Sequence, residues 1–372
     1  MDRAHSVLIL YASAGHGHEK AARAIEEVVR PRHDSVRCLD VLELSPGPFG
    51  RMYRGTYLFL IQHMPWLWGW LYYLADAPFL YPFLRPLRRA VNAFAGRRLE
   101  RIVIDGGFDT VIATHFFPTE VVSRMKRDGR TRARLITVIT DFLPHFFWVA
   151  EHVDLYAVAA EGTRAELLRR GVRPERITIT GIPIGKAFRV LPSREDARAY
   201  LEIEPSAFVV LLTSGGAGVG SMETLAAAIL RQGGPYTILA VCGTNRTLLA
   251  RLELLELREP SLLPMGFVEN MHELMSAADV VVGKAGGLTV SESLAAGRPL
   301  ILIRPVPGQE SRNAACVSAA GAARVVSGVD EAVRAIGRLL EDPASLEALK
   351  AAAARVGKLD AAERVAGMIH GA

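Results

Sequence analysis

The chain has 372 residues, of which 50% are hydrophobic and 22% charged, and its formal net charge is +5. This composition excludes a disordered chain, and the length favours two domains because a single core rarely grows so large. The positive charge suits an anionic ligand or surface, such as a nucleotide or a lipid headgroup layer. Cys38, Cys242 and Cys316 lack the spacing of metal ligands, so we expect reduced thiols. The apolar run at 7–12 is too short for a signal peptide, and no export is expected.

The first buried strand is expected at residues 6–12, followed by the glycine turn SAGHGH and a helix over 19–29. His18 stands at the first turn of this helix. A helix N-terminus lowers the pKa of a neighbouring histidine, which favours the neutral form that a general base needs. The alternative is a surface histidine in a loop.

Residues 53–101 interrupt the alternation of strands and helices. Between Leu58 and Leu84 the only Asp, Glu, Lys or Arg is Asp76, yet three prolines divide the run into pieces too short to cross about 30 Å of hydrocarbon. Its aromatic and basic residues suit a bilayer interface and anionic headgroups. The residues selected for this role are Trp66, Trp68, Trp70, Tyr72, Tyr73, Arg85, Arg88 and Arg89. We predict an interfacial insertion; a buried helical pair or a dimer contact is the alternative.

The alternation resumes with strands at 110–113 and 135–139, which precede His115 and Asp141. Ligands of doubly wound folds gather at the carboxyl ends of strands, so both side chains are candidates to line a cleft beside His18. Asp141 could orient or polarise an imidazole. A structural histidine and a capping aspartate are the alternatives.

The segment 181–192 is rich in Gly and Pro and predicts a connection between two domains, 1–185 and 193–350, with a C-terminal helix at 351–372. The second domain restarts with a strand at 207–213. The glycine turn that follows contains Gly215 and Gly216 and is expected to border a bound phosphate, or else to serve domain packing.

The stretch 280–309 reads as strand, glycine turn, helix, strand and proline-rich loop. Its helix begins at Gly286 and Gly287, so free N–H groups and the positive end of the dipole suit a phosphate. Glu292 lies one turn further on and could accept hydrogen bonds from a ribose. The polar pair Gln309 and Glu310 could reach sugar hydroxyls. An ordinary turn with a solvated glutamate is the alternative.

The segment GKAGGLTVSESLAAGRPLILI closely resembles the donor-binding segment of the GT-B glycosyltransferases. This superfamily includes the peptidoglycan N-acetylglucosaminyltransferase, the plant monogalactosyldiacylglycerol synthases and the bacterial diacylglycerol glucosyltransferases. SAGHGHEKAA, PWLWGWLYY and PGQESRN resemble the glycolipid-synthase branch in particular. The resemblance spans nearly the whole chain and implies an α/β fold of GT-B type, with two Rossmann-like domains facing across a cleft. By the same analogy, the C-terminal helix at 351–372 is expected to pack back on the first domain.

The resemblance also implies roles for individual residues. His18 becomes the base at the acceptor hydroxyl, and the aromatic insertion binds membrane and acceptor lipid. For a UDP-hexose donor, the uracil is assigned to Phe267 and Val268, the pyrophosphate to Gly287, Leu288 and Thr289, the ribose to Glu292, and the hexose to Gln309 and Glu310.

We therefore predict an inverting glycosyltransferase that moves a hexose from a UDP-sugar to diacylglycerol, peripherally bound at the cytoplasmic face of a bacterial membrane. No Asp-x-Asp signature appears, so neither a metal nor another cofactor is expected, and no nucleic-acid partner is expected. Glucose, galactose and glucuronate all stay open. Alternative functions are transfer of N-acetylglucosamine to a polyprenyl-linked cell-wall precursor, a UDP-sugar 2-epimerase, and a non-catalytic membrane-bound UDP-sugar sensor.

Overall fold

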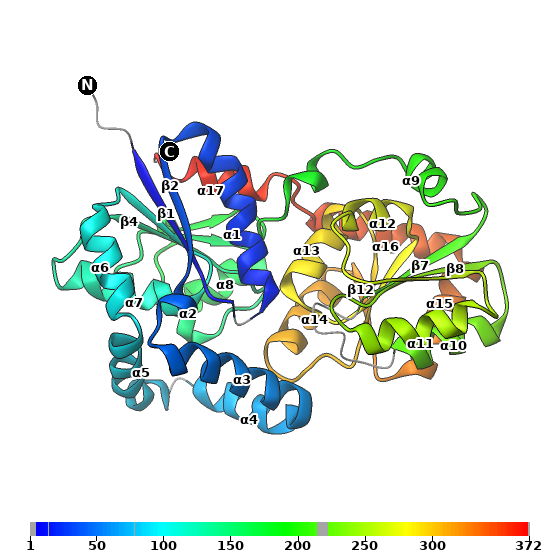
Figure 1. Ribbon diagram of the computed structural model, residues 1–372, viewed down its shortest axis with the longest axis horizontal. Coiled ribbons are helices and arrows are strands. Elements are labelled where there is room, and N and C mark those ends of the chain that lie inside the picture. The colour runs from blue at the N-terminus through cyan, green and yellow to red at the C-terminus, as the bar shows by residue number, and fades with distance from the viewer. Residues whose placement is uncertain (1–4, 14, 78, 214–221, 371–372) are drawn as a thin grey trace. The chain divides into compact units, whose positions relative to one another are not determined.

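The computed structural model describes residues 5–13, 15–77, 79–213 and 222–370, apart from a few side chains within helices (Figure 1). The chain divides into two compact units. Unit 1 comprises Met1–Lys186, Val306–Gln309 and Asp360–Ala372, and unit 2 comprises Ala187–Pro305 and Glu310–Leu359. The boundary lies within the predicted connection at 181–192, while unit 2 continues past the predicted end at residue 350.

Unit 1 is built on a six-stranded parallel sheet of order β2-β1-β3-β4-β5-β6. The strands are β1 Ser6–Tyr11, β2 Ser35–Asp40, β3 Thr110–Ala113, β4 Arg134–Val138, β5 Leu155–Val158 and β6 Ile177–Ile179. The helices around them are α1 His16–Val29, α2 Val41–Leu44, α6 Arg97–Gly106, α7 Phe116–Arg127, α8 Glu161–Arg169 and α17 Ala361–Gly367. Because every connection is a crossover, helices cover both faces of the sheet.

Strand β1 shows how the sequence builds these two layers. Val7 and Ile9 point to one face, where they pack with residues of α1 and α17. Leu8 and Leu10 point to the other face, into a core formed with α6 and α7. All four side chains are fully buried, as expected of a central strand in a parallel sheet.

Helix α17 brings the end of the chain back to unit 1. It packs on α1, and its apolar residues Ala362 and Val365 belong to the same buried cluster as Ile25 of α1. The preceding helix, α16 Pro343–Val356, remains in unit 2. The predicted segment 351–372 is therefore divided between the two units.

The aromatic insertion forms helices between β2 and β3: α3 Gly47–His63, α4 Pro65–Ala75 and α5 Tyr81–Ala95. Helices α3 and α4 pack together, as Figure 1 shows. No described helix combines the length and apolar character that a membrane span needs. The prolines act as predicted, since Pro65 and Pro82 lie in the first turns of α4 and α5.

Unit 2 contains a second six-stranded parallel sheet, of order β12-β11-β10-β7-β8-β9. Its strands are β7 Phe208–Thr213, β8 Tyr236–Val241, β9 Leu262–Met265, β10 Val280–Gly283, β11 Leu300–Ile303 and β12 Ala323–Val326. Besides α16, its helices are α9 Arg194–Tyr200, α10 Met222–Gln232, α11 Arg246–Glu256, α12 Met271–Ala277, α13 Gly287–Ala295, α14 Gln309–Ala319 and α15 Val329–Glu341. Gln309, the first residue of α14, is counted with unit 1.

Both sheets reverse their strand order, and such reversals place ligand sites. In unit 1 the chain passes from β1 outward to β2 and then returns to β3 on the other side of β1. In unit 2 it returns in the same way to β10, next to β7. Ligands of open α/β sheets bind at the carboxyl ends of the strands that flank such a reversal.

Candidate active site

His18 and His115 meet at the reversal point of unit 1. His18 lies in the first turn of α1, just after β1, and His115 follows β3 and caps α7 by accepting a hydrogen bond at Nδ1 from the Phe117 amide (3.1 Å). Their rings pack edge to face with centroids 4.7 Å apart. The two histidines predicted to share a cleft are thus in direct contact.

The hydrogen bonds of His18 define which ring nitrogen carries the proton. Nδ1 lies 2.9 Å from the backbone oxygen of Thr114 and 2.8 Å from the hydroxyl of Thr140. A carbonyl oxygen only accepts, so Nδ1 is the protonated nitrogen and Nε2 carries the lone pair. Within the described part of the chain Nε2 has no hydrogen-bond partner, which leaves it available to a substrate.

Thr114 and Thr140 are site residues that the motif analysis missed. The Thr114 hydroxyl also donates to the backbone oxygen of His18 (2.9 Å), so this residue holds both the ring and the main chain of His18. Both threonines directly precede a predicted site residue at a strand end. That shared position was the available signal, and spacing alone did not say which side chain would reach the imidazole.

Burial keeps both histidines neutral. Close packing of protein atoms around the ring lowers the pKa of His18 to about 4, although the hydrogen bond to Thr114 opposes this shift. Burial, together with the neighbouring His18, places the pKa of His115 well below its ordinary value. The direction agrees with the prediction for His18, but the main cause is desolvation and not the helix N-terminus.

Asp141 holds Trp148 and Gln309. Its carboxylate accepts a hydrogen bond from the indole N–H of Trp148 (3.1 Å) and one from the Gln309 amide. The Trp148 ring lies beside both histidines, 6.2 Å from His18 and 6.3 Å from His115 between centroids. Asp141 therefore positions Trp148, which forms a wall of the site. The contacts with Nδ1 of His18 come from Thr114 and Thr140 and not from Asp141.

The segment Val306–Gln309 packs tightly on the aromatic insertion within unit 1. A Cβ added at Gly69 would lie 2.4 Å from the Pro307 side chain, and one added at Gly308 would lie 2.9 Å from the ring of Tyr72. Gly308 also has a φ of 104°, which other residues rarely adopt. These two glycines let α4 approach the segment that presents Gln309.

The insertion is also joined to the site by a buried ion pair. Asp76, at the end of α4, accepts two hydrogen bonds from the Arg170 guanidinium (2.9 and 3.1 Å) and one from the Phe146 amide (2.5 Å). His145 donates from Nε2 to the backbone oxygen of Tyr72 (3.0 Å), since its Nδ1 accepts from the Phe147 amide. The contacts of His145 and Phe146 thus connect α4 with Trp148, which follows them in the chain.

The aromatic residues of α4 fall into two sets. Trp66, Trp70 and Tyr73 are exposed on one face, with exposed fractions of 68%, 59% and 45%. Trp68 and Tyr72 are half-buried and pack against each other, and Trp68 also packs against Tyr57. The insertion therefore has an interior side and an exposed aromatic side.

The three arginines selected for headgroup contact differ from one another. Arg88 points inward, pairs with Glu120 at 2.8 Å and lies over the ring of Phe147. Arg89 is half-exposed, and the side chain of Arg85 lies outside the described residues. Because Arg88 is mostly enclosed, the structure places it in the packing of α5 and not on an outer surface.

In unit 2 the residues predicted for the donor follow the carboxyl ends of strands β9, β10 and β11. Helix α13 begins directly after the β10 turn, and its N-cap, Gly286, provides no side-chain hydrogen bond to the first amides. Glu292 is buried within this helix, and Asn313 supports the turn by donating to the Ala285 oxygen (3.0 Å). The N-terminus of α13 thus retains donors suited to an anion.

The remaining predicted donor residues are positioned as follows. Gly287, Leu288 and Thr289 form the first turn of α13, and Glu310 lies in the first turn of α14. Phe267 and Val268 follow β9, and the ring of Phe267 is exposed. Gly215 and Gly216 lie outside the described residues.

The described residues contain no group of three His, Cys, Asp or Glu side chains arranged to hold a metal ion. Cys38, Cys242 and Cys316 are free thiols. Burial raises the pKa of Cys38 to about 12 and that of Cys242 to about 11, so both remain protonated.

Comparison with solved structures identifies the fold. The fold resembles Acinetobacter baumannii MurG, with a TM-score of 0.64, 15% identity and 99% of each chain covered. It also resembles Anabaena Alr3699/HepE in complex with UDP, with a TM-score of 0.58, 16% identity and 99% and 100% of the two chains covered. The predicted GT-B fold is therefore confirmed.

Comparison of sequences identifies the family. A model of monogalactosyldiacylglycerol (MGDG) synthase matches residues 18–184, and one of the glycosyltransferase family 28 C-terminal domain matches residues 217–365. The "Processive diacylglycerol beta-glucosyltransferase" of Bacillus licheniformis is 30% identical over 356 residues, covering 94% of this chain and 90% of the relative. The chain belongs to this family of glycosyltransferases. The predicted family and the prediction of an enzyme are confirmed.

The pH dependence of transfer is expected to report the low pKa of His18. A general base at His18 would have to be unprotonated. We therefore expect kcat/KM to stay constant as the pH falls from 7 to about 5 and to reach half of its value at about pH 4, the pKa of the His18 ring. The measurement is kcat/KM against pH, with folding monitored by near-UV circular dichroism. A fall centred at the ordinary histidine value of 6.5 would contradict this description of the site.

The free energy of unfolding should also depend on pH, between about pH 4 and 6.5. An unfolded histidine takes up a proton near pH 6.5, whereas folded His18 does so only at about 4, so between these values the unfolded chain binds more protons. The contribution of His18 to the free energy of unfolding is therefore complete above pH 6.5 and decreases as the pH falls toward 4.

Proposed function

We propose that this protein transfers a hexose from a UDP-sugar to diacylglycerol with inversion at the anomeric carbon. The observation that supports it best is the arrangement of His18, whose Nδ1 is fixed by Thr114 while no described residue forms a hydrogen bond with Nε2. This arrangement occurs in a chain whose Bacillus licheniformis relative is named a diacylglycerol beta-glucosyltransferase.

The proposed step is a single displacement. His18 Nε2 accepts the proton of the acceptor hydroxyl as that oxygen forms a bond to the anomeric carbon. The bond from the anomeric carbon to UDP breaks, and UDP leaves with the bonding electrons. An α-linked donor then gives a β-glycoside, and the step requires no metal.

Helix α13 is the proposed anchor of the UDP group. The uncapped amides of Gly287, Leu288 and Thr289 would donate to the pyrophosphate and stabilise the charge that develops on it. Glu292 is proposed at the ribose, and Phe267 and Val268 at the uracil, with Gly215 and Gly216 bordering the phosphates. The similar fold of HepE, whose structure contains UDP, supports a nucleotide donor.

The hexose is assigned to Gln309 and Glu310. Asp141 orients the Gln309 amide by accepting its N–H, so we assign Asp141 a positioning role. His115 packs edge-on against His18 and restricts the plane of its ring. These two residues keep the base and the sugar contact in place without themselves transferring a proton.

The exposed aromatic side of the insertion is the proposed membrane contact. Trp66, Trp70 and Tyr73 on this side are 68%, 59% and 45% exposed, and Phe79 and Phe83 of the same insertion are 73% and 77% exposed. Aromatic residues on short helices suit the interface between headgroups and acyl chains. We propose peripheral attachment to the anionic cytoplasmic face of a membrane, where diacylglycerol is the acceptor.

A panel of radiolabelled UDP-hexoses tests this function. Each is incubated with the protein and vesicles containing diacylglycerol or a polyprenyl-linked sugar, with EDTA present. The proposal predicts a labelled diacylglycerol glycolipid from one donor, formed in the presence of EDTA. Transfer to the polyprenyl acceptor alone, conversion of the free UDP-sugar, or UDP binding without turnover would support the cell-wall enzyme, the epimerase or the sensor instead.

A further inference from the structure

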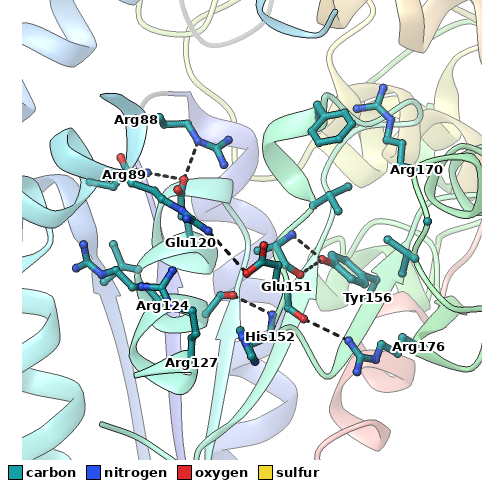
Figure 2. Close-up of a pocket in the computed structure, with 18 of the residues that line it drawn as sticks. Arg88, Arg89, Glu120, Arg124, Arg127, Glu151, His152, Tyr156, Arg170 and Arg176 are labelled. Atoms are coloured by element: carbon teal, nitrogen blue, oxygen red, sulfur yellow. Dashed lines mark hydrogen bonds and ion pairs between the residues drawn. The ribbon is translucent and has the colours of Figure 1, made fainter. Parts of the chain in front are cut away.

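Unit 1 contains a cavity of about 580 Å³ that none of the proposed transfer residues lines (Figure 2). It is bordered by α5, α7, the loop after Trp148, and the turn that follows α8. Among the residues that line it are seven arginines and only two glutamates. Its volume is in the range that small-molecule ligands occupy.

Three of these arginines form enclosed ion pairs with carboxylates of the protein. Arg88 pairs with Glu120, Arg124 with Glu100, and Arg170 with Asp76, and in each pair both side chains are at most 17% exposed. Arg124 and Arg170 also lie at the C-terminal ends of α7 and α8, where a cation interacts favourably with the helix dipole. These ion pairs and helix-end positions explain the presence of the three arginines without a ligand.

The other four, Arg89, Arg127, Arg173 and Arg176, are half-exposed or exposed. Arg89 approaches Glu151 only to 3.7 Å, and Arg173 pairs with Glu175 where both side chains are about 60% exposed. Arg127 pairs with its chain neighbour Asp128, also in solvent. Exposed pairs of this kind contribute little stability, so an incoming anion can compete for them.

Arg176 has no carboxylate contact among the described residues. Its guanidinium donates only to the backbone oxygens of Glu151 and Val153, at 3.4 and 3.3 Å. Figure 2 shows Arg89 and Arg176 on opposite sides of Glu151. An anion that displaced the Glu151 carboxylate from Arg89 would lie between two guanidinium groups.

We propose that this arginine cavity binds a phosphate-bearing anion. Guanidinium groups match phosphate oxygens in planar, bidentate geometry, and several of them in one concave site raise the local positive potential. Two sources share this chemistry, namely free phosphate and the headgroup of a phospholipid. The second is compatible with α5, which lines the cavity with Arg89 and Asn92 while exposing Phe83 and Phe94 elsewhere on its surface.

The site goes beyond the proposed transfer reaction, and its test measures binding without turnover. Inorganic phosphate is titrated into the full chain by calorimetry with UDP at saturation, so that the proposed donor site is filled. The test variant is Arg89→Gln with Arg176→Gln. The matched control is Arg334→Gln with Arg338→Gln, which removes two exposed arginines from a second basic hollow, in unit 2.

A second arm measures flotation with vesicles of phosphatidylcholine alone or with phosphatidylglycerol added. The proposal predicts a loss of at least tenfold in one of two quantities for the test variant, compared with the wild type and the control. These are the affinity for phosphate and the increase in vesicle binding that phosphatidylglycerol causes. The arm that shows this loss identifies the source of the phosphate. Equal behaviour of test and control variants in both arms would overturn the proposal. Thermal unfolding of both variants is measured alongside, and an unchanged midpoint is expected because the replaced side chains lie at the surface.

Discussion

Replacing His18 with alanine is expected to lower kcat/KM for hexose transfer by about 10²–10⁴-fold, the usual contribution of a general base. The expectation rests on the proton position, since Thr114 fixes Nδ1–H and leaves Nε2 to accept the acceptor proton. Binding of UDP should be retained, because the residues proposed for the UDP group lie in unit 2, whereas His18 lies in unit 1.

His16→Ala is the matched control for this variant. His16 is exposed, begins the same helix and lies two residues away. Its replacement should leave transfer near the wild-type rate. Both variants are assayed with UDP binding by calorimetry and with thermal unfolding. If His18→Ala folds, binds UDP and still transfers at the wild-type rate, the base is another group.

Replacing Asp76 with alanine is expected to lower the free energy of unfolding by about 3 kcal/mol. The carboxylate is only 6% exposed and its partner Arg170 only 9%, so removing it leaves a buried guanidinium with Glu166 as its remaining carboxylate contact. The Phe146 amide also loses its acceptor. Because the segment 145–148 leads to Trp148, transfer activity should fall as well.

A double-mutant cycle separates this ion pair from a simple loss of packing. The double variant Asp76→Ala with Arg170→Ala should lose less free energy of unfolding than the two single variants lose together, since neither charge is then left without its partner. Glu175→Ala is the control, because its pair with Arg173 is about 60% exposed on both sides and should contribute at most about 1 kcal/mol. Additive single effects, measured by urea unfolding, would show that Asp76 and Arg170 are not coupled.

Local patterns were sufficient to predict the fold class. Runs such as Val7–Tyr11 and Val280–Val282 are buried strands, and the glycines after them mark the turns into α1 and α13. His18, His115 and Asp141 follow strands in the sequence, and this pattern predicted that they lie close together. The reason is general, since carboxyl ends of parallel strands share one edge of a sheet.

Contacts between distant segments were beyond reach of the sequence. Nothing in the pattern showed that Gly69 would pack on Pro307, or that Gln309 would donate to Asp141, because each pair joins residues more than 160 positions apart. The direction of Arg88 was missed for another reason. Arg88 and Arg89 are chain neighbours on α5, so their positions in the sequence did not show which of them packs against Glu120.

The anomeric configuration of the product tests the central claim, a single displacement assisted by His18, most directly. The glycolipid made from an α-linked UDP-hexose and diacylglycerol is isolated, and the coupling constant of its anomeric proton is measured by NMR. A β-glycoside is the predicted result. An α-glycoside would contradict the account, because retention requires a step that a single base at His18 does not provide.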